Sequence, residues 1–177
     1  GAVLVECGPG STLPHLVSGL NVYGYKPQDV TDVFVTHIHL DHAGAAGWLG
    51  NQGVRVHVHP VGAPHLQNPE KLLASAARIY GDQMDSLWGN IYPVRQDRLH
   101  VIHDGESVQC SDLTVRAVDV PGHADHQFAY FVGDVCFSGD IAGIRVHKLP
   151  FITIPMPPPE FHLEKWRESI RRLQKEK

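Results

Sequence analysis

Cysteine is scarce in this sequence. The chain of 177 residues contains three, Cys7, Cys110 and Cys136, and no two of them have the Cys-x-x-Cys spacing. An odd and sparse set excludes a disulfide scaffold and a thiolate zinc site, and it favours a reducing, cytoplasmic compartment. We expect Cys7 and Cys136 to be small buried residues without a chemical role.

Long apolar runs and clusters of positive charge are also missing. No apolar stretch approaches the roughly 18 residues that a membrane-spanning helix needs, and the formal net charge is −4. These absences argue against a membrane partner and against nucleic-acid binding through a basic surface. No Gly-x-Ser-x-Gly sequence is present, which removes the usual serine-nucleophile turn. A small-molecule substrate is the expected partner, and self-association into a homo-oligomer is left open.

The composition is that of a folded domain with an excess of histidine. Hydrophobic residues make up 42% and charged residues 19% of the chain, which excludes a disordered or coiled-coil protein. We expect a single domain over residues 1–177, because a chain of this length buries roughly 70% of its unfolded surface. The thirteen histidines are more than a core needs. They indicate a chemical role.

Hydrophobic periodicity predicts strands and helices that alternate in the first half of the chain, followed by a strand meander. A final amphipathic helix carries charges on its outer face. The pattern indicates an α/β fold. Strands are expected at residues 2–5, 33–36, 54–58, 113–118, 128–132 and 135–138, helices at 11–20, 43–49, 69–88 and 163–173, and an extended proline-rich connector at 155–159.

The densest chemical signal is the segment Thr36-His37-Ile38-His39-Leu40-Asp41-His42, directly after an apolar strand. Side chains two apart on an extended segment point to the same side, so His37 and His39 can bind one ion together. Asp41 and His42 then enter a helix and can face a second ion. Imidazole and carboxylate ligands suit zinc, and also iron or manganese. The alternative is a chance cluster of histidines. Four ionisable groups within six residues make that explanation the poorer one.

Three further segments carry weak signals by themselves. Gly122-His123 and Gly139-Asp140 both follow predicted strands, where a histidine or an aspartate is often an ordinary turn residue. The segment that starts at Glu6 and continues through Cys7 to Gly-Pro-Gly indicates only a tight turn. Their order along the chain gives them weight.

Taken in order, these four segments resemble the signature of the metallo-β-lactamase superfamily: an acidic strand–turn, His-x-His-x-Asp-His, Gly-His and Gly-Asp. The resemblance implies an αββα sandwich with the metal site at the edge of the sheet. It also implies two bound metal ions, zinc by preference. Carried over residue by residue, the first ion would be bound by His37, His39 and His123, and the second by Asp41 and His42, with Asp140 bridging.

Two features depart from the family pattern. The family usually has Asp where this chain has Glu6, behind a metal ligand, and Glu accepts the same hydrogen bond from one methylene further. The family's last ligand is a histidine on a strand after the C-terminal helix, and here the sequence ends with that helix. We therefore expect a fragment trimmed at both ends, with the last ligand beyond Lys177. Otherwise that ligand has to be found among His126, His147 and His162.

Other stretches, at 59–66, 122–126 and 157–161, resemble a bacterial and archaeal branch of metal-dependent hydrolases with a glyoxalase II-like metal motif. We expect the helical insert at 60–90 to fold over the site. The candidate substrate-binding residues are His59, Tyr80, Trp88 and His126. The alternatives are that both aromatic residues belong to a helix core and that His59 caps a turn.

The resemblance implies a metal-dependent hydrolase in which a hydroxide held by two metal ions attacks an ester, thioester or lactone carbonyl. Asp41 is the candidate catalytic residue, because a carboxylate near bound water can orient it. Three alternatives stay open: a phosphodiesterase on the same scaffold, a mono-iron oxidoreductase similar to sulfur dioxygenases, and a non-catalytic metal-binding or scaffolding module. Metal analysis separates them, since two zinc ions favour hydrolysis, one iron favours oxygenation and no metal favours the non-catalytic module.

Overall fold

The computed structural model describes residues 1–145, 150–157 and 160–176. His147, residues 158–159 of the predicted connector and Lys177 lie outside the described residues. The chain forms two compact units, Gly1–Ile102 and His103–Lys177.

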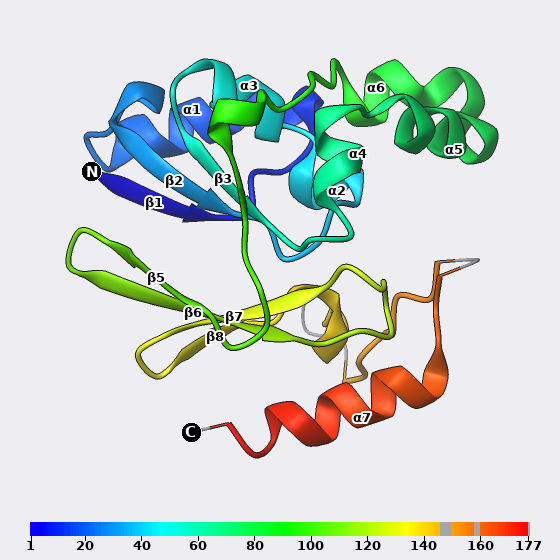
Figure 1. Ribbon diagram of the computed structural model, residues 1–177. Coiled ribbons are helices and arrows are strands. Elements are labelled where there is room, and N and C mark those ends of the chain that lie inside the picture. The colour runs from blue at the N-terminus through cyan, green and yellow to red at the C-terminus, as the bar shows by residue number, and fades with distance from the viewer. Residues whose placement is uncertain (146–149, 158–159, 177) are drawn as a thin grey trace. The chain divides into compact units, whose positions relative to one another are not determined.

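The first unit is built on a parallel sheet with strand order β1-β2-β3-β4. Figure 1 labels β1, β2 and β3 of this sheet. Parallel neighbours need crossover connections, and helices supply them. Three of the four strands agree with the predicted strands within a few residues, whereas β4 is short and was not predicted. The strands are β1 (Ala2–Val5), β2 (Val30–Phe34), β3 (Arg55–Val58) and β4 (Leu99–Val101).

The helices of the first unit follow the predicted pattern only in part. The helix expected at 43–49 is two short helices, because the chain turns at Gly44 and Ala45. The helix expected at 69–88 is divided by a 3-10 turn at Gly81–Gln83, where Gly81 has a positive φ of 53°. Thr12 is the N-cap of α1, but its hydroxyl donates to the Pro9 carbonyl at 3.0 Å and does not cap the helix. The helices are α1 (Leu13–Val22), α2 (Leu40–Ala43), α3 (Ala46–Asn51), α4 (Ala63–Gln67), α5 (Glu70–Tyr80) and α6 (Met84–Trp88).

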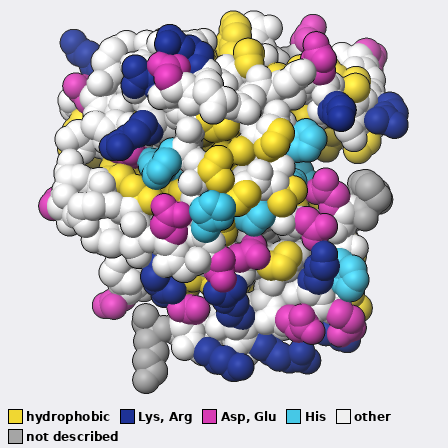
Figure 2. Space-filling model, in the orientation of Figure 1, with side chains coloured by type: hydrophobic (Ala, Val, Ile, Leu, Met, Phe, Trp, Pro, Cys, Tyr) yellow, Lys and Arg dark blue, Asp and Glu magenta, His cyan; other side chains and the backbone are white. Residues whose placement is uncertain are grey.

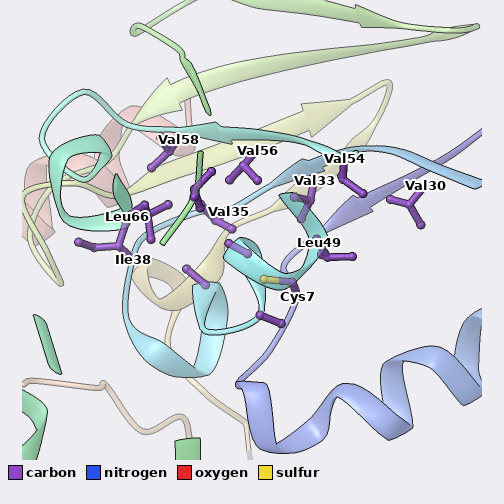
Figure 3. Close-up of a cluster of buried hydrophobic side chains, with 14 of the residues drawn as sticks. Cys7, Val30, Val33, Val35, Ile38, Leu49, Val54, Val56, Val58 and Leu66 are labelled. Atoms are coloured by element: carbon purple, nitrogen blue, oxygen red, sulfur yellow. The ribbon is translucent and has the colours of Figure 1, made fainter. Parts of the chain in front are cut away.

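Valines of the two central strands, together with Val35 directly after β2, form the centre of the first core. Figure 3 shows Val33 and Val35 beside Val56 and Val58, with helix residues such as Leu49 in the same cluster. All four valines are fully buried. Burying a side chain of this kind contributes about 1.5–3 kcal/mol, so the end of β2 that carries the histidine motif is firmly held.

The second unit contains an antiparallel meander, β5-β6-β7-β8, and one long helix, α7. The predicted meander strands and final helix are confirmed, and β5 was not predicted. Gly133 adopts a positive φ of 54° in the β7–β8 hairpin. The elements are β5 (Ser107–Cys110), β6 (Leu113–Asp119), β7 (Phe128–Val132), β8 (Val135–Phe137) and α7 (Leu163–Leu173).

Helix α7 packs on this second sheet through three of its four predicted apolar residues. Trp166, Ile170 and Leu173 contact a buried cluster that includes Val118, whereas Leu163 is 44% exposed. Figure 2 shows Lys and Arg side chains interspersed with Asp and Glu over α7. The helix is therefore amphipathic, as its sequence predicts.

The two sheets and their helices confirm the predicted α/β class. Within the part of the chain that the structure describes, no helix has both the length and the apolar character needed to cross a membrane.

Candidate metal centre

The predicted metal ligands of the first unit lie where β2 ends and α2 begins. The ring centroids of His37 and His39 are 4.6 Å apart, and those of His37 and His42 are 4.0 Å apart. The ligand atoms of each pair lie within 4.8 Å of each other. Asp41 lies in the first turn of α2, with Oδ2 3.5 Å from Nε2 of His42. The turn into a helix brings these four predicted ligands together.

A hydrogen-bonded chain determines which nitrogen of His37 carries the proton. The Thr36 hydroxyl donates its single proton to the Glu6 carboxylate. The same oxygen lies 3.0 Å from Nδ1 of His37, so it accepts the Nδ1 proton there. His37 therefore carries its lone pair on Nε2, the form that binds a metal.

Glu6 orients His42 in the same way. Its Oε1 lies 3.1 Å from Nδ1 of His42, and an ionised carboxylate can only accept, so the proton is on Nδ1 and the lone pair is on Nε2. Glu6 itself has a φ of 68°, which costs a non-glycine residue about 1–2 kcal/mol. The longer Glu side chain thus reaches the ligand that the family's Asp is expected to support.

The second unit holds the other two predicted ligands close together. His123 lies in the loop after β6, and its Nδ1 is 3.0 Å from the carbonyl oxygen of Pro155. Because a carbonyl accepts, His123 also carries its lone pair on Nε2. Asp140 lies in a turn after β8, with Oδ2 3.5 Å from Nε2 of His123. Both side chains are buried.

These arrangements fit a divalent metal ion. In each unit a nitrogen lone pair faces a carboxylate oxygen at 3.5 Å, in the pairs His42–Asp41 and His123–Asp140. With the imidazole neutral, two acceptors this close repel each other, and a cation between them would bind both. Metal-binding histidines characteristically donate their other N–H to a carboxylate, a carbonyl or a similar oxygen. His37, His42 and His123 all do so here.

The predicted substrate-binding residues have mixed surroundings. His59 is buried, and its Nδ1 accepts the Val61 backbone N–H at 3.1 Å, so it does cap a turn. Tyr80 and Trp88 form an edge-to-face pair with centroids 5.0 Å apart, and Tyr80 is 37% exposed. His126 is buried, with Nε2 3.5 Å from a carboxylate oxygen of Glu160.

Two supporting groups were not predicted from the sequence. Thr36 precedes the first histidine of the motif directly, and this position was the available signal. The Pro155 carbonyl that holds His123 had none, because a backbone carbonyl is present at every residue. His162, an alternative ligand, is the N-cap of α7, and its Nδ1 accepts the Lys165 N–H at 3.3 Å.

A second polar cluster, also not predicted, links three strands of the first unit. Nε2 of His57 lies 2.7 Å from Oδ1 of Asp32, and Nδ1 of His57 lies 2.8 Å from Nδ1 of His100. The ring of Phe34 stacks on His57 at 4.1 Å. Burial lowers the pKa of His57 to about 4, although Asp32 opposes the shift. Burial raises the pKa of the Asp32 carboxyl, but hydrogen bonds, first that of His57, and the Arg55 charge outweigh it, so this pKa is lowered.

The cysteines confirm one expectation and contradict another. Cys7 is buried and donates its S–H to the His42 carbonyl at 3.2 Å. Burial and the Glu6 charge raise the pKa of its thiol, so it is no nucleophile. The prediction for Cys136 is wrong: this residue is exposed, because it lies on β8, whose three residues are all exposed.

Comparison with known proteins finds a similar hydrolase sequence and similar metallo-beta-lactamase structures. A hydroxyacylglutathione hydrolase from Shewanella sp. (strain ANA-3) is 26% identical over 108 residues, which are 61% of this chain and 33% of that protein. An archaeal metallo-beta-lactamase superfamily protein from Sulfolobus tokodaii has a TM-score of 0.73 at 24% identity, covering 96% of this chain and 64% of that one. The FEZ-1 metallo-beta-lactamase from Legionella gormanii has a TM-score of 0.71 at 20% identity, covering 100% and 66%.

The chain thus spans a third of the similar hydrolase and less than two thirds of each of these two structural relatives. At these identities the structural relatives show the fold. The model of the metallo-beta-lactamase superfamily matches residues 1–177. This chain belongs to the metallo-beta-lactamase superfamily.

Proposed function

We propose that this chain belongs to a metal-dependent hydrolase that cleaves a carboxylic ester, thioester or lactone. The observation that carries the proposal is the pair of acceptor contacts, His42–Asp41 and His123–Asp140, each at 3.5 Å and each with the histidine lone pair on Nε2. A divalent cation between the two groups would bind both acceptors. Membership of the superfamily supports the hydrolytic reaction.

We propose a dinuclear zinc centre with the ligands assigned by the family motif. His37, His39 and His123 would bind one ion, Asp41 and His42 the other, and Asp140 would bridge them. A zinc pair bound in this way supplies an activated water and a Lewis acid for a carbonyl oxygen.

The protein's own contribution is orientation. Thr36, Glu6 and the Pro155 carbonyl hold the Nδ1 protons of His37, His42 and His123, so the three Nε2 atoms are ready to bind without a proton shift. Asp41, whose side chain is 56% exposed, would accept a hydrogen bond from the attacking water and orient it.

Among substrates, the similarity to a hydroxyacylglutathione hydrolase favours an acyl thioester. We propose a small-molecule substrate and a cytoplasmic location, in line with the sparse cysteines. A phosphodiesterase, a mono-iron oxidoreductase and a non-catalytic module are the competing outcomes of the test below.

The test combines metal analysis with a substrate panel. The purified chain, loaded with zinc and dialysed, should retain zinc and hydrolyse a member of a thioester, ester and lactone panel. Removing the metal with a chelator should abolish turnover, and zinc should restore it. His37→Ala should remove most of the metal and lower the rate at least 100-fold, because a ligand is lost. His15→Ala, on the exposed face of α1, is the matched control and should change neither.

Other results would redirect the proposal. Full metal content and activity in His37→Ala would contradict the ligand assignment. A single bound iron would favour the oxidoreductase, and turnover of phosphodiesters alone would favour the phosphodiesterase. A chain that binds no metal would favour the non-catalytic module.

A further inference from the structure

The loop that carries His123 is tied to α7 along its length. This loop, residues 119–125, starts at the last residue of β6, and β7 begins three residues after its end. The residues of α7 and its N-cap that contact it are His162, Lys165, Trp166, Ser169 and Arg172. They lie at positions i, i+3, i+4, i+7 and i+10, which places them on one face of the helix.

Three of these contacts hold backbone carbonyls on the N-terminal side of His123. The Arg172 guanidinium donates to the carbonyl of Asp119 at 3.0 Å. The Ser169 hydroxyl donates to the carbonyl of Pro121 at 2.7 Å. The backbone N–H of His162 donates to the carbonyl of Gly122 at 2.8 Å. On the other side of His123, Nζ of Lys165 lies 2.7 Å from a carboxylate oxygen of Asp125.

The residue before His123 has no room to move towards the helix. Gly122 has a φ of 138°, a conformation that favours glycine. A Cβ at this position would lie 2.4 Å from the Trp166 Cα. The backbone of Gly122 thus packs directly against α7. The helix therefore determines the position of the backbone just before His123.

Ser169 is the least replaceable of these contacts. Its side chain is buried, with 4% exposure, in a helix whose other residues are all at least partly exposed. The Pro121 carbonyl that it holds is two residues from His123, and Pro121 has no N–H with which to fix the loop from within. A buried hydroxyl donating to one carbonyl has a defined direction that an apolar side chain cannot replace.

We propose that α7 is the positioning element of the metal centre and that Ser169 is the positioning residue for His123. This inference rests on the proposed function, in which His123 binds a metal ion. Ser169 sets the backbone at Pro121, and the Pro155 carbonyl sets the ring. Together they determine where Nε2 of His123 lies.

A double-mutant cycle on zinc affinity tests the proposal. The metal-free chain is titrated with zinc against a chromogenic chelator for wild type, Ser169→Ala, His123→Ala and the double variant. Ser169→Ala should weaken zinc binding about tenfold, as loss of an outer support does. In the His123→Ala background the same change should have no further effect, because Ser169 acts through His123. Alanine is the better helix former, so α7 itself is not weakened.

A matched control separates positioning from stability. Glu176→Gln breaks the 2.7 Å ion pair with Arg116 near the end of α7, without releasing any carbonyl of the 119–125 loop. It should lower the melting temperature and leave zinc affinity unchanged, which shows that loss of stability at this end of the helix does not by itself weaken zinc binding.

The outcomes are distinct. If His123→Ala weakens zinc binding but Ser169→Ala does not, the positioning role is refuted and the metal site stands. If Ser169→Ala has the same effect in both backgrounds, or Glu176→Gln weakens zinc binding equally, Ser169 is only structural. If His123→Ala leaves zinc affinity unchanged, the proposed ligand set fails, and the positioning role fails with it.

Discussion

At the scale of single residues, Glu6 is the clearest example of a side chain that serves another. Its two oxygens accept from the Thr36 hydroxyl and backbone N–H, and one of them also holds Nδ1 of His42. It combines this role with a strained backbone, φ 68°. Strain of this kind persists where the surrounding structure enforces it, and it is frequent at functional sites.

We expect Glu6→Gln to weaken zinc binding about tenfold while the fold survives. Glutamine keeps the size of the side chain but removes the charge that favours the Nδ1 proton of His42. Zinc competition with a chelator measures the effect, and far-ultraviolet circular dichroism checks the fold. Glu70→Gln, an exposed position in the first turn of α5, should behave as wild type. Unchanged affinity in Glu6→Gln would show that His42 does not need the carboxylate.

At the scale of elements, the α5–α6 segment is held against the turn that follows β1. The Ser11 hydroxyl donates to the Leu87 carbonyl at 2.6 Å. Gly89 has a φ of 63°, and a Cβ there would lie 2.6 Å from the Ser11 backbone nitrogen. The insert thereby contacts the turn at Gly10–Thr12, which begins four residues after Glu6. Its aromatic pair, Tyr80 and Trp88, lies apart from the proposed ligands in sequence.

We expect Trp88→Ala to change substrate preference more than metal content. Tyr80 is the exposed member of the aromatic pair and suits contact with an apolar acyl group, and Trp88 packs against its ring. Without Trp88 the Tyr80 ring loses this support, so KM for the best substrate should rise severalfold, with zinc stoichiometry unchanged. Steady-state kinetics and metal analysis on the same preparation measure both. Ile79→Ala, which removes another exposed apolar side chain from α5, is the control. A stability loss of about 3 kcal/mol with an unchanged substrate profile would identify Trp88 as core instead.

At the scale of the whole molecule, the Asp32–His57–His100 cluster couples stability to pH. Because burial lowers the pKa of His57 from 6.5 to about 4, the unfolded chain takes up a proton near pH 6.5 that the folded chain takes up only near pH 4. The stabilising contribution is complete above pH 6.5 and falls as the pH falls through this window. The lowered pKa of Asp32 acts in the same direction at still lower pH.

We therefore expect the metal-free protein to lose about 2 kcal/mol of stability through His57 between pH 7.5 and pH 5.0. Urea unfolding at the two pH values measures this loss. His57→Gln should be less stable at pH 7.5 and should lack this part of the pH dependence. His15→Gln, at an exposed position, should keep the wild-type dependence. Equal pH dependence in His57→Gln and wild type would show that the cluster does not titrate as argued.

The sequence by itself determined the elements with strong periodicity and the ligands that lie close together along the chain. Valine-rich β2 and β3 and the amphipathic α7 follow from local pattern. His37, His39, Asp41 and His42 lie within six residues of one another in the sequence. Their proximity can therefore be predicted before the fold is known. Short strands such as β4 were not predicted, because the hydrophobic periodicity of three residues is too weak to identify a strand.

The folded structure alone shows which groups support those ligands and which polar residues share a buried cluster. Glu6 meets Thr36 across 30 residues, Asp32 meets His57 across 25, and Ser169 meets Pro121 across 48. No local pattern predicts such contacts, because they depend on strand register and helix packing. The physical reason is that the strength of a hydrogen bond changes with a few tenths of an ångström in distance and with direction. The free energy of hydrophobic burial depends mainly on the apolar area removed from water.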